Sequence, residues 1–370
     1  MKVICSTQKL SKAAQIIQKA LPTKAVSPIL TGIYFKAEGN KIEMQATDYE
    51  IGIAMTIEAE VLEEGQIMLP GNYFTNLLRR LSGETVEIEK NDEENKIFIK
   101  SGSYQIDLLS TPANDYPVLN KLAVSNFVQI KDEVLKDLIK KTVFACSNDE
   151  SRPIFTGVYV EIKDKEISFV ATNTHRMAFK KYTSETDNGN FSMVIPAKVL
   201  KEIDRINVGD LPEDVVISWK NRQIAVRIGD IYIESRLIEG SFPDYKKVIP
   251  DSFSKDAKFK TNELLGAVER VSLLFKEGEY NVVRLNIDNN QITVTSNNPE
   301  MGKAQEIITC ENAGGQIEIA FNSRYLNDIL KNIETENSII SLNSSVSPAC
   351  VKPEGDDNYI YIVTPIRVAY

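Results

Sequence analysis

Residue types that usually perform catalysis are few and widely spaced in this sequence. His175 is the single histidine among 370 residues, and the four cysteines (Cys5, Cys146, Cys310 and Cys350) form no CxxC pair. Because only one histidine could join them as a metal ligand and their spacing is wide, the cysteines are expected to be four reduced, packed thiols rather than a zinc cluster or a disulfide framework. We therefore expect no bound metal and no cofactor.

The motifs of common enzyme classes are missing as well. The sequence has no GxSxG, GxxxxGK[ST], GxGxxG or HExxH segment, so nucleotide cradles, serine nucleophiles and zinc hydrolysis lack their usual parts. Carboxylates could still form an active site, but they occur in runs such as Asp92-Glu93-Glu94 and Asp356-Asp357, which are typical of solvated turns. A binding protein without catalytic activity is the leading hypothesis, and a carboxylate-based hydrolase is the second.

Basic residues gather on the predicted helices although the whole chain is acidic. With 43 Lys and Arg against 52 Asp and Glu, the formal net charge is −9, so affinity for nucleic acid needs a local basic face. Lys and Arg outnumber Glu on the polar helix faces, although Glu is nearly as good a helix former. Such a face suits the phosphates of a duplex. The alternatives are a solvated face and a sequence-specific regulator, which would need a recognition helix rich in Arg, Asn and Gln.

The composition is that of an ordinary globular protein, with 42% hydrophobic and 26% charged residues. No run of about 18 apolar residues could cross a membrane, and the segment MKVICSTQKLSKAAQ lacks the apolar stretch of a signal peptide. We expect a cytoplasmic protein with no membrane contact. At about 150 residues per domain, the length predicts two or three domains.

An internal repeat of about 125 residues organises the chain. Gly32 and Gly157 lie 125 residues apart, as do Asp48 and Asn173, and Asn297 follows after 124 more. Each repeat is expected to open with an amphipathic helix, because apolar residues recur near the i, i+3, i+4 and i+7 positions. We predict three domains, residues 1–124, 125–251 and 252–370.

The pattern within each repeat predicts an α+β fold. After the first helix comes a strand, a turn such as Gly39-Asn40 or Asn289-Asn290 and a second, alternating strand, which together indicate a hairpin. A second helix then begins near Pro70, Pro196 or Phe321, and three further strands follow it. Two helices on one side of curved antiparallel sheet are the natural arrangement for each domain.

Four segments, in this order and spacing, resemble one known family. They are ATNTHRMA from Ala171, EGSFPDYKKVIP from Glu239, SNNPE from Ser296 and VTPIRV from Val363. Together with the threefold repeat they cover the whole chain and resemble the bacterial sliding clamps, the beta subunit of replicative DNA polymerase III. The resemblance implies the DNA-clamp fold in three domains, closed into a ring by two chains head to tail.

The same resemblance implies a function without catalysis. Members of the family are processivity factors that encircle double-stranded DNA and slide along it without sequence specificity. Implied partners are a second copy of the chain, the alpha subunit of DNA polymerase III, the clamp loader, and other polymerases and repair proteins that carry a clamp-binding peptide.

A hydrophobic pocket between the second and third domains is implied to hold that peptide, typically a Gln-x-x-Leu-Phe-like sequence. Carried over residue by residue, the pocket would comprise Phe155, Thr172, Thr174, His175, Arg176, Met177, Pro243, Val248, Ser347, Ile362, Thr364, Pro365, Ile366 and Arg367. The chain departs from the family pattern at Thr174, where glycine is usual, and at Thr364 and Ile366, where methionine or leucine is common. His175 as a structural residue, and Pro365 with Ile366 as a plain edge strand, are the alternatives to this pocket.

Two further groups of residues follow from the resemblance, except that Lys198 and Lys201 are supported by their position on a predicted helix. Lys24, Arg152, Lys198 and Lys201 are the candidates for contact with DNA phosphates. For ring closure, Ile106 and Leu108 of the first domain would meet Leu273 and Leu274 of a partner's third domain. The alternative for these four apolar residues is that all of them belong to the core.

Overall fold

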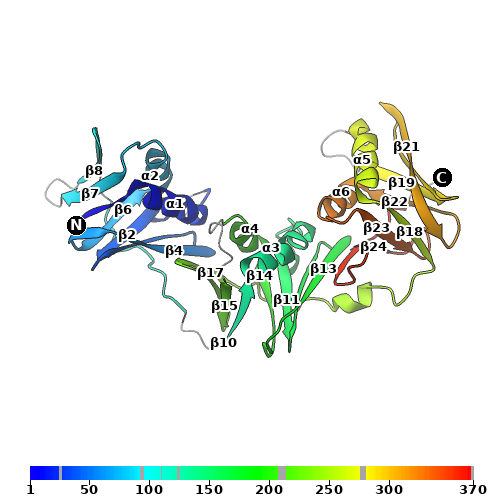
Figure 1. Ribbon diagram of the computed structural model, residues 1–370, viewed down its shortest axis with the longest axis horizontal. Helices are drawn as coiled ribbons and strands as arrows, with labels where there is room; N and C mark the ends of the chain where they lie inside the picture. Colours follow the sequence, from blue (N-terminus) through cyan, green and yellow to red (C-terminus); the bar gives the residue numbers. More distant parts are fainter. Residues whose placement is uncertain are drawn as a thin grey trace. The chain divides into compact units, whose positions relative to one another are not determined.

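The structure is a computed structural model that combines α-helices with antiparallel strands in three repeats (Figure 1). It describes residues 1–24, 27–91, 96–109, 111–122, 126–206, 214–275 and 281–367. Three sequence predictions lie outside these ranges: the domain boundary at Val124, the acidic turn at Asp92-Glu93-Glu94 and the terminal Tyr370.

The first repeat contains helices α1 (Thr7–Ile17) and α2 (Gly71–Leu78). Its strands are β1 (Lys2–Ser6), β2 (Gly32–Glu38), β3 (Lys41–Thr47), β4 (Ile51–Glu58), β5 (Glu60–Glu63), β6 (Gly65–Pro70), β7 (Thr85–Asn91), β8 (Lys96–Ser101) and β9 (Tyr104–Leu109).

The second repeat contains α3 (Asp132–Lys140) and α4 (Ala197–Asp204). Its strands are β10 (Asn126–Lys131), β11 (Gly157–Lys163), β12 (Glu166–Thr172), β13 (Arg176–Thr183), β14 (Asn190–Pro196), β15 (Asp214–Lys220), β16 (Gln223–Ile228) and β17 (Ile231–Arg236).

The third repeat contains α5 (Thr261–Val271) and α6 (Ser323–Lys331). Its strands are β18 (Lys255–Lys260), β19 (Val282–Asp288), β20 (Gln291–Asn298), β21 (Gly302–Ala313), β22 (Ile317–Asn322), β23 (Asn337–Leu342), β24 (Ala349–Pro353) and β25 (Tyr359–Val363).

The predicted start of each repeat was wrong in one respect. A short strand, β1, β10 or β18, precedes the first helix of each repeat, and these segments are too short for their alternation to stand out. The predicted strands at Ser27 and Ser151 also begin later than expected. Pro28 and Pro153 instead start 3-10 turns, because proline has no N–H to give to a sheet and its fixed φ suits a first helical turn.

The chain forms two compact units. Unit 1 comprises residues 1–135 and 205–237, and unit 2 comprises 136–204 and 238–370. Unit 1 holds a five-stranded sheet (β5-β1-β7-β8-β9) and an eight-stranded sheet (β10-β15-β16-β17-β4-β3-β2-β6), whereas unit 2 holds one sheet in the order β14-β11-β12-β13-β25-β24-β23-β18-β21-β20-β19-β22. Because each large sheet takes strands from two repeats, neighbouring repeats share hydrogen-bonded backbone.

The helices pack by the stripes that the sequence predicts. Leu10, Ala13, Ala14 and Ile17 of α1 are fully buried, and α1 lies against α2, as α5 lies against α6 (Figure 1). The N-cap of α6 is Asn322, whose side-chain oxygen accepts a hydrogen bond of 2.9 Å from the N–H of Arg324, a cap that satisfies one of the free donors of a helix start. The predicted starts of the second helices are thus confirmed to within two residues.

A side-chain turn recurs in all three repeats and fixes their alignment. Oδ1 of Asp48 accepts from the N–H groups of residues 50 and 51, and Oδ1 of Asn173 accepts from residues 175 and 176. In the third repeat Asn298 accepts from residues 300 and 301 in the same way. The prediction of Asn297 as the equivalent residue was therefore wrong by one position. Asn297 and Asn298 are neighbours of the same type, so only the hydrogen bonds of the folded chain distinguish which of them forms the turn.

The segments that leave the first and second repeats lie against sheet strands through aromatic stacking. In unit 1 the ring of Tyr116 stacks on Tyr34 at 5.2 Å between centroids. In unit 2 the ring of Phe242 stacks on Tyr159, 125 residues after Tyr34, at 4.8 Å. Arg284 takes the corresponding place in the third repeat, so the aromatic side chain at this position belongs to the first two repeats.

All four cysteines are free. Burial raises the pKa of the Cys5, Cys146 and Cys350 thiols to about 12, so these thiols stay protonated and weakly nucleophilic at neutral pH. Within the described residues, no three His, Cys, Asp or Glu side chains lie close enough together to hold a metal ion. Nor does the described chain include a helix long and apolar enough to cross a membrane.

Candidate functional site

Several of the predicted pocket residues lie in or against the turn that joins β12 to β13 in unit 2. Thr172 Oγ1 donates to the carbonyl of Arg176 at 2.6 Å and accepts from the N–H of Thr174 at 3.1 Å. With the Asn173 bonds described above, these contacts close the turn and leave the Thr174 and His175 side chains exposed at its tip. The turn is thus held by its own hydrogen bonds and forms one wall of the predicted pocket, with the His175 side chain exposed.

The segment that follows β25 forms a second wall. Both the N–H and Oγ1 of Thr364 donate to the carbonyl of His175, at 3.0 and 2.8 Å. Two residues later, the N–H of Ile366 donates to the carbonyl of Ala320 on β22 at 2.8 Å. The residues predicted from VTPIRV therefore reach both the His175 turn and the edge of the last sheet strand.

A small hollow of about 90 Å³ opens beside this segment. It is lined by Arg284, Glu318, Ile319, Ala320, Ser345, Val346, Ile366 and Arg367. Ile366 and Arg367 were predicted for the pocket, whereas Val346, which is 59% exposed, was missed. The predicted Ser347 is not among the lining residues of this hollow, and its hydroxyl group lies 2.7 Å from Ser344 Oγ.

An apolar cluster supports these walls from below. Val170, Met177, Tyr245, Cys350 and Ile362 form its buried centre, and Phe242 packs against it. Met177 and Ile362 face one another in the β13–β25 pair and are 2% and 1% exposed. These two predicted pocket residues therefore form a floor beneath the surface rather than the surface itself.

The remaining predicted residues are neighbours of side chains that pack against the cluster: Phe155 contacts Phe242, Pro243 follows Phe242 in the sequence, and Val248 precedes Ile249. The ring of Phe155 meets that of Phe242 edge to face, with 6.2 Å between centroids. Pro243 and Val248 are exposed, Val248 by 45%. An exposed aliphatic side chain beside a packed aromatic cluster is the kind of surface that accepts an apolar peptide anchor.

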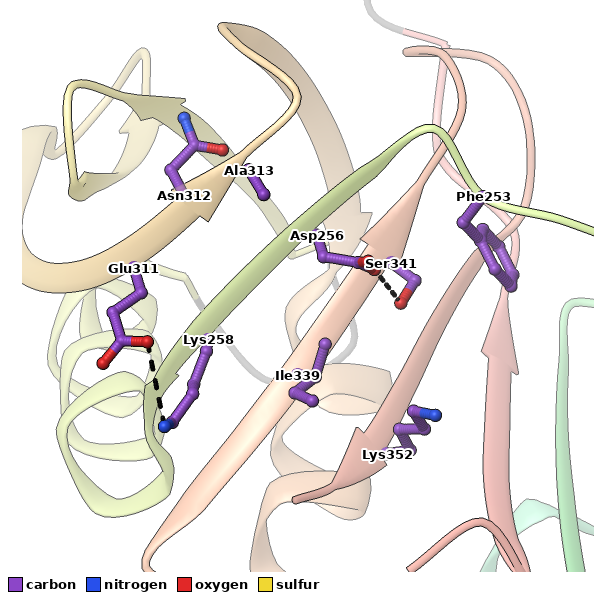
Figure 2. Close-up of a pocket in the computed structure, with 9 residues that line it drawn as sticks. All are labelled: Phe253, Asp256, Lys258, Glu311, Asn312, Ala313, Ile339, Ser341 and Lys352. Carbon is purple, nitrogen blue, oxygen red and sulfur yellow. Dashed lines mark hydrogen bonds and ion pairs between the residues drawn. The ribbon is translucent and has the colours of Figure 1, made fainter. Parts of the chain in front are cut away.

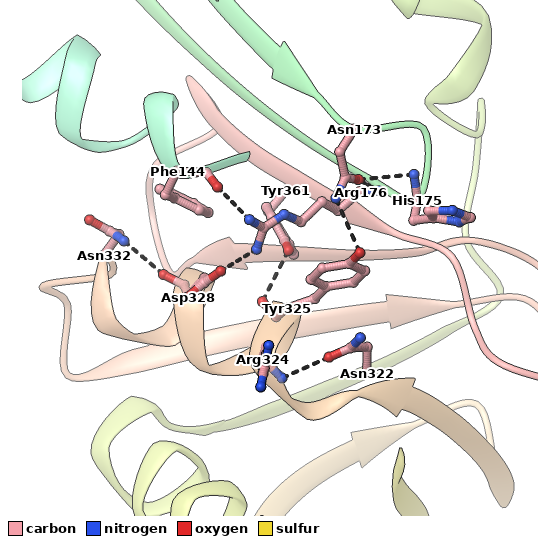
Figure 3. A network of polar contacts seen from close by, with 10 residues as sticks. All are labelled: Phe144, Asn173, His175, Arg176, Asn322, Arg324, Tyr325, Asp328, Asn332 and Tyr361. Carbon is pink, nitrogen blue, oxygen red and sulfur yellow. Dashed lines mark hydrogen bonds and ion pairs between the residues drawn. The ribbon is translucent and has the colours of Figure 1, made fainter. Parts of the chain in front are cut away.

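Arg176 has a different place from its neighbours in the motif. Its guanidinium is turned inward, where Nη1 bonds Asp328 of α6 and Nη2 bonds the carbonyl of Phe144 (Figure 3). The guanidinium carbon lies 4.6 Å from the ring centroid of Tyr325 and 5.6 Å from that of Phe144. No site role was predicted for Tyr325 or Asp328. They are three residues apart on one helix, and that spacing does not indicate that their partners, Asn173 and Arg176, lie 152 residues earlier in the sequence.

Thr174 is the residue under backbone strain at this site. Its φ is +75°, a left-handed conformation that costs L residues about 1–2 kcal/mol and that β-branched residues rarely adopt. We predict that Thr174→Gly raises the free energy of unfolding of unit 2 by roughly 0.5–1 kcal/mol, because glycine escapes the steric cost but loses more chain entropy on folding. Denaturant titration would measure this.

Thr174→Ala is the matched control for that strain. Alanine keeps the Cβ that causes the clash and loses the hydroxyl and methyl groups of an exposed side chain, so we expect it to leave the unfolding free energy within about 0.5 kcal/mol of the parent. A glycine variant no more stable than the alanine variant would show that the turn is unstrained.

The candidate DNA contacts all lie on the surface. Lys24, Arg152, Lys198 and Lys201 are exposed, and the last two stand on α4 opposite its buried Val199, Leu200 and Ile203. Within the helix bounds, however, basic and acidic residues are nearly equal in number. The predicted basic excess lies in residues that flank the helices, such as Lys19, Arg79, Arg80, Lys141 and Arg205, because the sequence pattern overestimated helix length.

None of the four candidate ring-closure residues is buried. Ile106 and Leu108 on β9 are half-buried, as is Leu274, and Leu273 is 81% exposed. The alternative that all four belong to the core is therefore wrong. Leu273 and Leu274 lie in a 3-10 turn, Ser272–Leu274, that follows α5 directly. The carbonyl group of Leu274 accepts a hydrogen bond of 2.9 Å from Asn298 Nδ2.

A larger hollow, of about 460 Å³, lies on the face of β18, β21, β23 and β24 (Figure 2). Its charged groups already have partners: Lys258 bonds Glu354 at 2.8 Å, Lys352 bonds Asp357 at 2.6 Å, and Asp256 accepts from Ser341 at 2.5 Å. Because these groups are satisfied, we assign no function to this hollow.

Comparison with known proteins covers the chain almost from end to end. The family described as the DNA polymerase III beta subunit matches by its N-terminal domain at residues 1–120, its central domain at 129–244 and its C-terminal domain at 246–367. A beta sliding clamp of Staphylococcus epidermidis is 33% identical over 358 residues, 94% of each chain.

Solved structures agree with this. A DNA polymerase sliding clamp from Bacillus subtilis superposes with a TM-score of 0.95 at 30% identity, with all of both chains covered. The beta subunit of the DNA polymerase of Streptococcus pyogenes gives a TM-score of 0.94 at 28% identity, again over both whole chains. The chain described here belongs to the DNA polymerase III beta subunit family, the bacterial sliding clamps.

Proposed function

We propose that two copies of this chain close head to tail into a ring around duplex DNA in the cytoplasm. The ring has no catalytic activity of its own. It slides along the duplex and tethers the alpha subunit of DNA polymerase III, the clamp loader, and other polymerases and repair proteins through the pocket around His175. The pairing pattern of the repeats carries this proposal.

Each junction between repeats uses the same pair of strands. The strand after the Asp48 turn, β4, pairs with β17, the last strand of the second repeat, with Ile51 opposite Ser235. The strand after the Asn173 turn, β13, pairs with β25, the last strand of the third repeat, with Arg176 opposite Val363. The rule is that a strand after an Asx turn pairs antiparallel with the last strand of the next repeat.

The third repeat is the last of the three that the structure describes. Its strand after the Asn298 turn, β21, pairs with β20 over Gly302–Thr309 and with β18 only from Cys310 onward. The last strand of the first repeat, β9, ends its sheet with β8 as its described neighbour. Each chain therefore offers one edge of each kind, and exposed edges of this sort invite pairing with another chain.

The rule also predicts the register of that pairing. Met301 corresponds to Ile51, since each stands three residues after its Asx residue. Leu108 corresponds to Ser235, because the tight turns before β9 and β17 align Ser101 with Ile228. We therefore expect Met301 of one chain opposite Leu108 of the other, which brings Ile106 and Leu108 toward the Leu273 turn. Two such unlike contacts close a dimeric ring.

The exposed apolar residues near both edges support this closure. Leu109 is 80% exposed, Leu273 81%, Met301 61% and Ile307 54%. Large apolar side chains that gather at two complementary edges are typical of an interaction surface, because a monomer rarely leaves them in water. Their burial between chains would supply the hydrophobic centre of the contact.

Affinity for DNA in this proposal comes from phosphates and from topology. Lys198 and Lys201 on α4, with Lys24 and Arg152 in loops, offer exposed cations that contact phosphates without reading bases. A closed ring then keeps the duplex by linkage, so weak contacts suffice. A tethered polymerase rebinds as an intramolecular event, at a local concentration of about millimolar.

The test is retention on DNA of different topology. We expect the chain, once loaded by its clamp loader onto nicked circular duplex, to co-elute with that DNA and to leave when one cut linearises the circle, because only a ring can slide off an end. Gel filtration before and after cleavage measures the bound fraction. Equal retention on circular and linear DNA would contradict the topological link.

A further inference from the structure

The buried guanidinium of Arg176 connects the pocket turn to a helix of the third repeat. The Arg176 side chain is only 8% exposed, and a buried charge is stable only when it is paired and hydrogen-bonded. Asp328 on α6 is its acidic partner, and the carbonyl of Phe144 takes a second donor. The rings of Tyr325 and Phe144 lie near the guanidinium.

The same helix holds the other end of the turn. Asn173 Nδ2 donates to the hydroxyl of Tyr325 at 3.1 Å, and its Oδ1 accepts from the N–H groups of His175 and Arg176 at 3.0 Å each (Figure 3). The carbonyl of His175 in turn accepts both bonds from Thr364. Contacts from α6 therefore reach His175 and the C-terminal wall through two side chains of the turn.

The ion pair between Arg176 and Asp328 belongs to one junction between repeats only. Ile51 and Met301 stand where Arg176 stands, three residues after Asp48 and Asn298. Ile51 makes its turn with an apolar, buried side chain, so the Asx turn needs no arginine to form. The arginine and its carboxylate partner are therefore an addition at the one junction that carries the pocket.

We propose that Asp328 is a positioning residue for peptide binding. Its carboxylate holds Arg176 inward, which fixes the 173–176 turn and with it His175 and the bonds from Thr364. It does this without touching the peptide. The inference rests on the proposed peptide-binding function of this pocket and adds that the pocket is set by the docking of α6.

Asp328→Asn is the variant that tests this role. It keeps the shape of the side chain and removes its charge, so the turn should lose its fixed position while the helix remains. Variants that act without touching the ligand change coupling by amounts that correspond to about threefold to thirtyfold in affinity, and we expect a loss in this range. Fluorescence anisotropy of a labelled Gln-x-x-Leu-Phe peptide on the full-length chain measures it.

Two controls accompany this variant. Asp328→Glu retains the charge and should bind within about threefold of the parent, the rescue that a charge-dependent role requires. Glu269→Gln removes a carboxylate from another ion pair that involves α6, the 2.8 Å contact with Lys331, whose side chains are both well exposed. Exposed pairs of this kind contribute about 0–1 kcal/mol to stability, so peptide affinity should not change.

The single histidine supplies a direct readout of position. Because His175 is the only one in the chain, its imidazole gives one set of NMR signals that reports on the turn. We expect Asp328→Asn to shift these signals in the peptide-free protein, and Glu269→Gln to leave them in place. In the Arg176→Gln background, Asp328→Asn should add no further loss of affinity, because both changes break one contact.

The outcomes separate this inference from the function on which it rests. Unchanged affinity and unchanged His175 signals in Asp328→Asn would overturn it, as would an equal loss in Glu269→Gln or a loss that Asp328→Glu does not restore. If the parent chain fails to bind the peptide at all, the proposed pocket function is wrong. The His175 signals would still decide whether Asp328 positions the turn.

Discussion

Leu273→Asp is expected to convert the proposed dimer into monomers. Leu273 is 81% exposed in the single chain and would be buried beside Ile106 and Leu108 of the other copy. An aspartate there carries an unpaired charge into an apolar contact and loses the leucine anchor. We expect the dimer Kd to rise at least about a hundredfold, or about 3 kcal/mol. The molar mass measured by light scattering after gel filtration should fall from twice the chain mass of 41.5 kDa to the mass of a single chain.

The matched control is Leu62→Asp. Leu62 is 50% exposed on β5, at the opposite edge of the five-stranded sheet from β9. The same substitution there should leave the dimer intact, since the repeat rule places no second copy on β5. The Leu273 variant should also lose its retention on nicked circles, because a monomer cannot enclose DNA. A dimer that survives Leu273→Asp would refute the proposed closure through the Leu273 turn.

Deletion of residues 364–370 is expected to abolish peptide binding and to leave the proposed dimer in place. The deletion removes Thr364, which donates two bonds to the His175 carbonyl, and Ile366, which is bonded to Ala320. With one wall and part of the hollow gone, affinity should fall by about a hundredfold or more. Fluorescence anisotropy with the same labelled peptide measures the loss, and β9 and β21 keep their edges.

Truncation after Arg367 is the control for this deletion. It retains every described contact of the C-terminal wall, so it should bind the peptide as the full chain does. If the chain that ends at Val363 bound the peptide with the same affinity as the full-length chain, the pocket assignment would be wrong. Loss of the dimer in that shorter chain would instead point to a wider structural role for the last segment.

Much of the fold could be predicted because its features are local and repeated. The apolar stripe of α1, the helix starts after Pro70 and Pro196, and the hairpin turns at Gly39 and Asn289 each follow from a few neighbouring residues. Gly39 and Asn289 have φ of 59° and 46°, the left-handed values that tight hairpins require. Three copies of one pattern made each weak indication stronger.

Parts of the site could not be predicted, because their contacts join distant residues. Met177 and Ile362 were expected to line a pocket, but cross-strand pairing buries both beneath it. No sequence pattern separates a pocket surface from its supporting floor when both alternate along one strand. The inward turn of Arg176 toward Asp328 likewise depends on where α6 packs.

The sequence alone determined the threefold repeat and the apolar faces of the helices, because these depend on residue type and spacing along the chain, whereas the candidate residues of the pocket came from its resemblance to the sliding clamps. Only the tertiary structure decided which strands pair across repeats, which edges stay free and which motif residues turn inward. The physical reason is that hydrogen-bond pairing and burial depend on neighbours in space, and such neighbours lie far apart in the sequence, as Arg176 and Asp328 do at a separation of 152 residues.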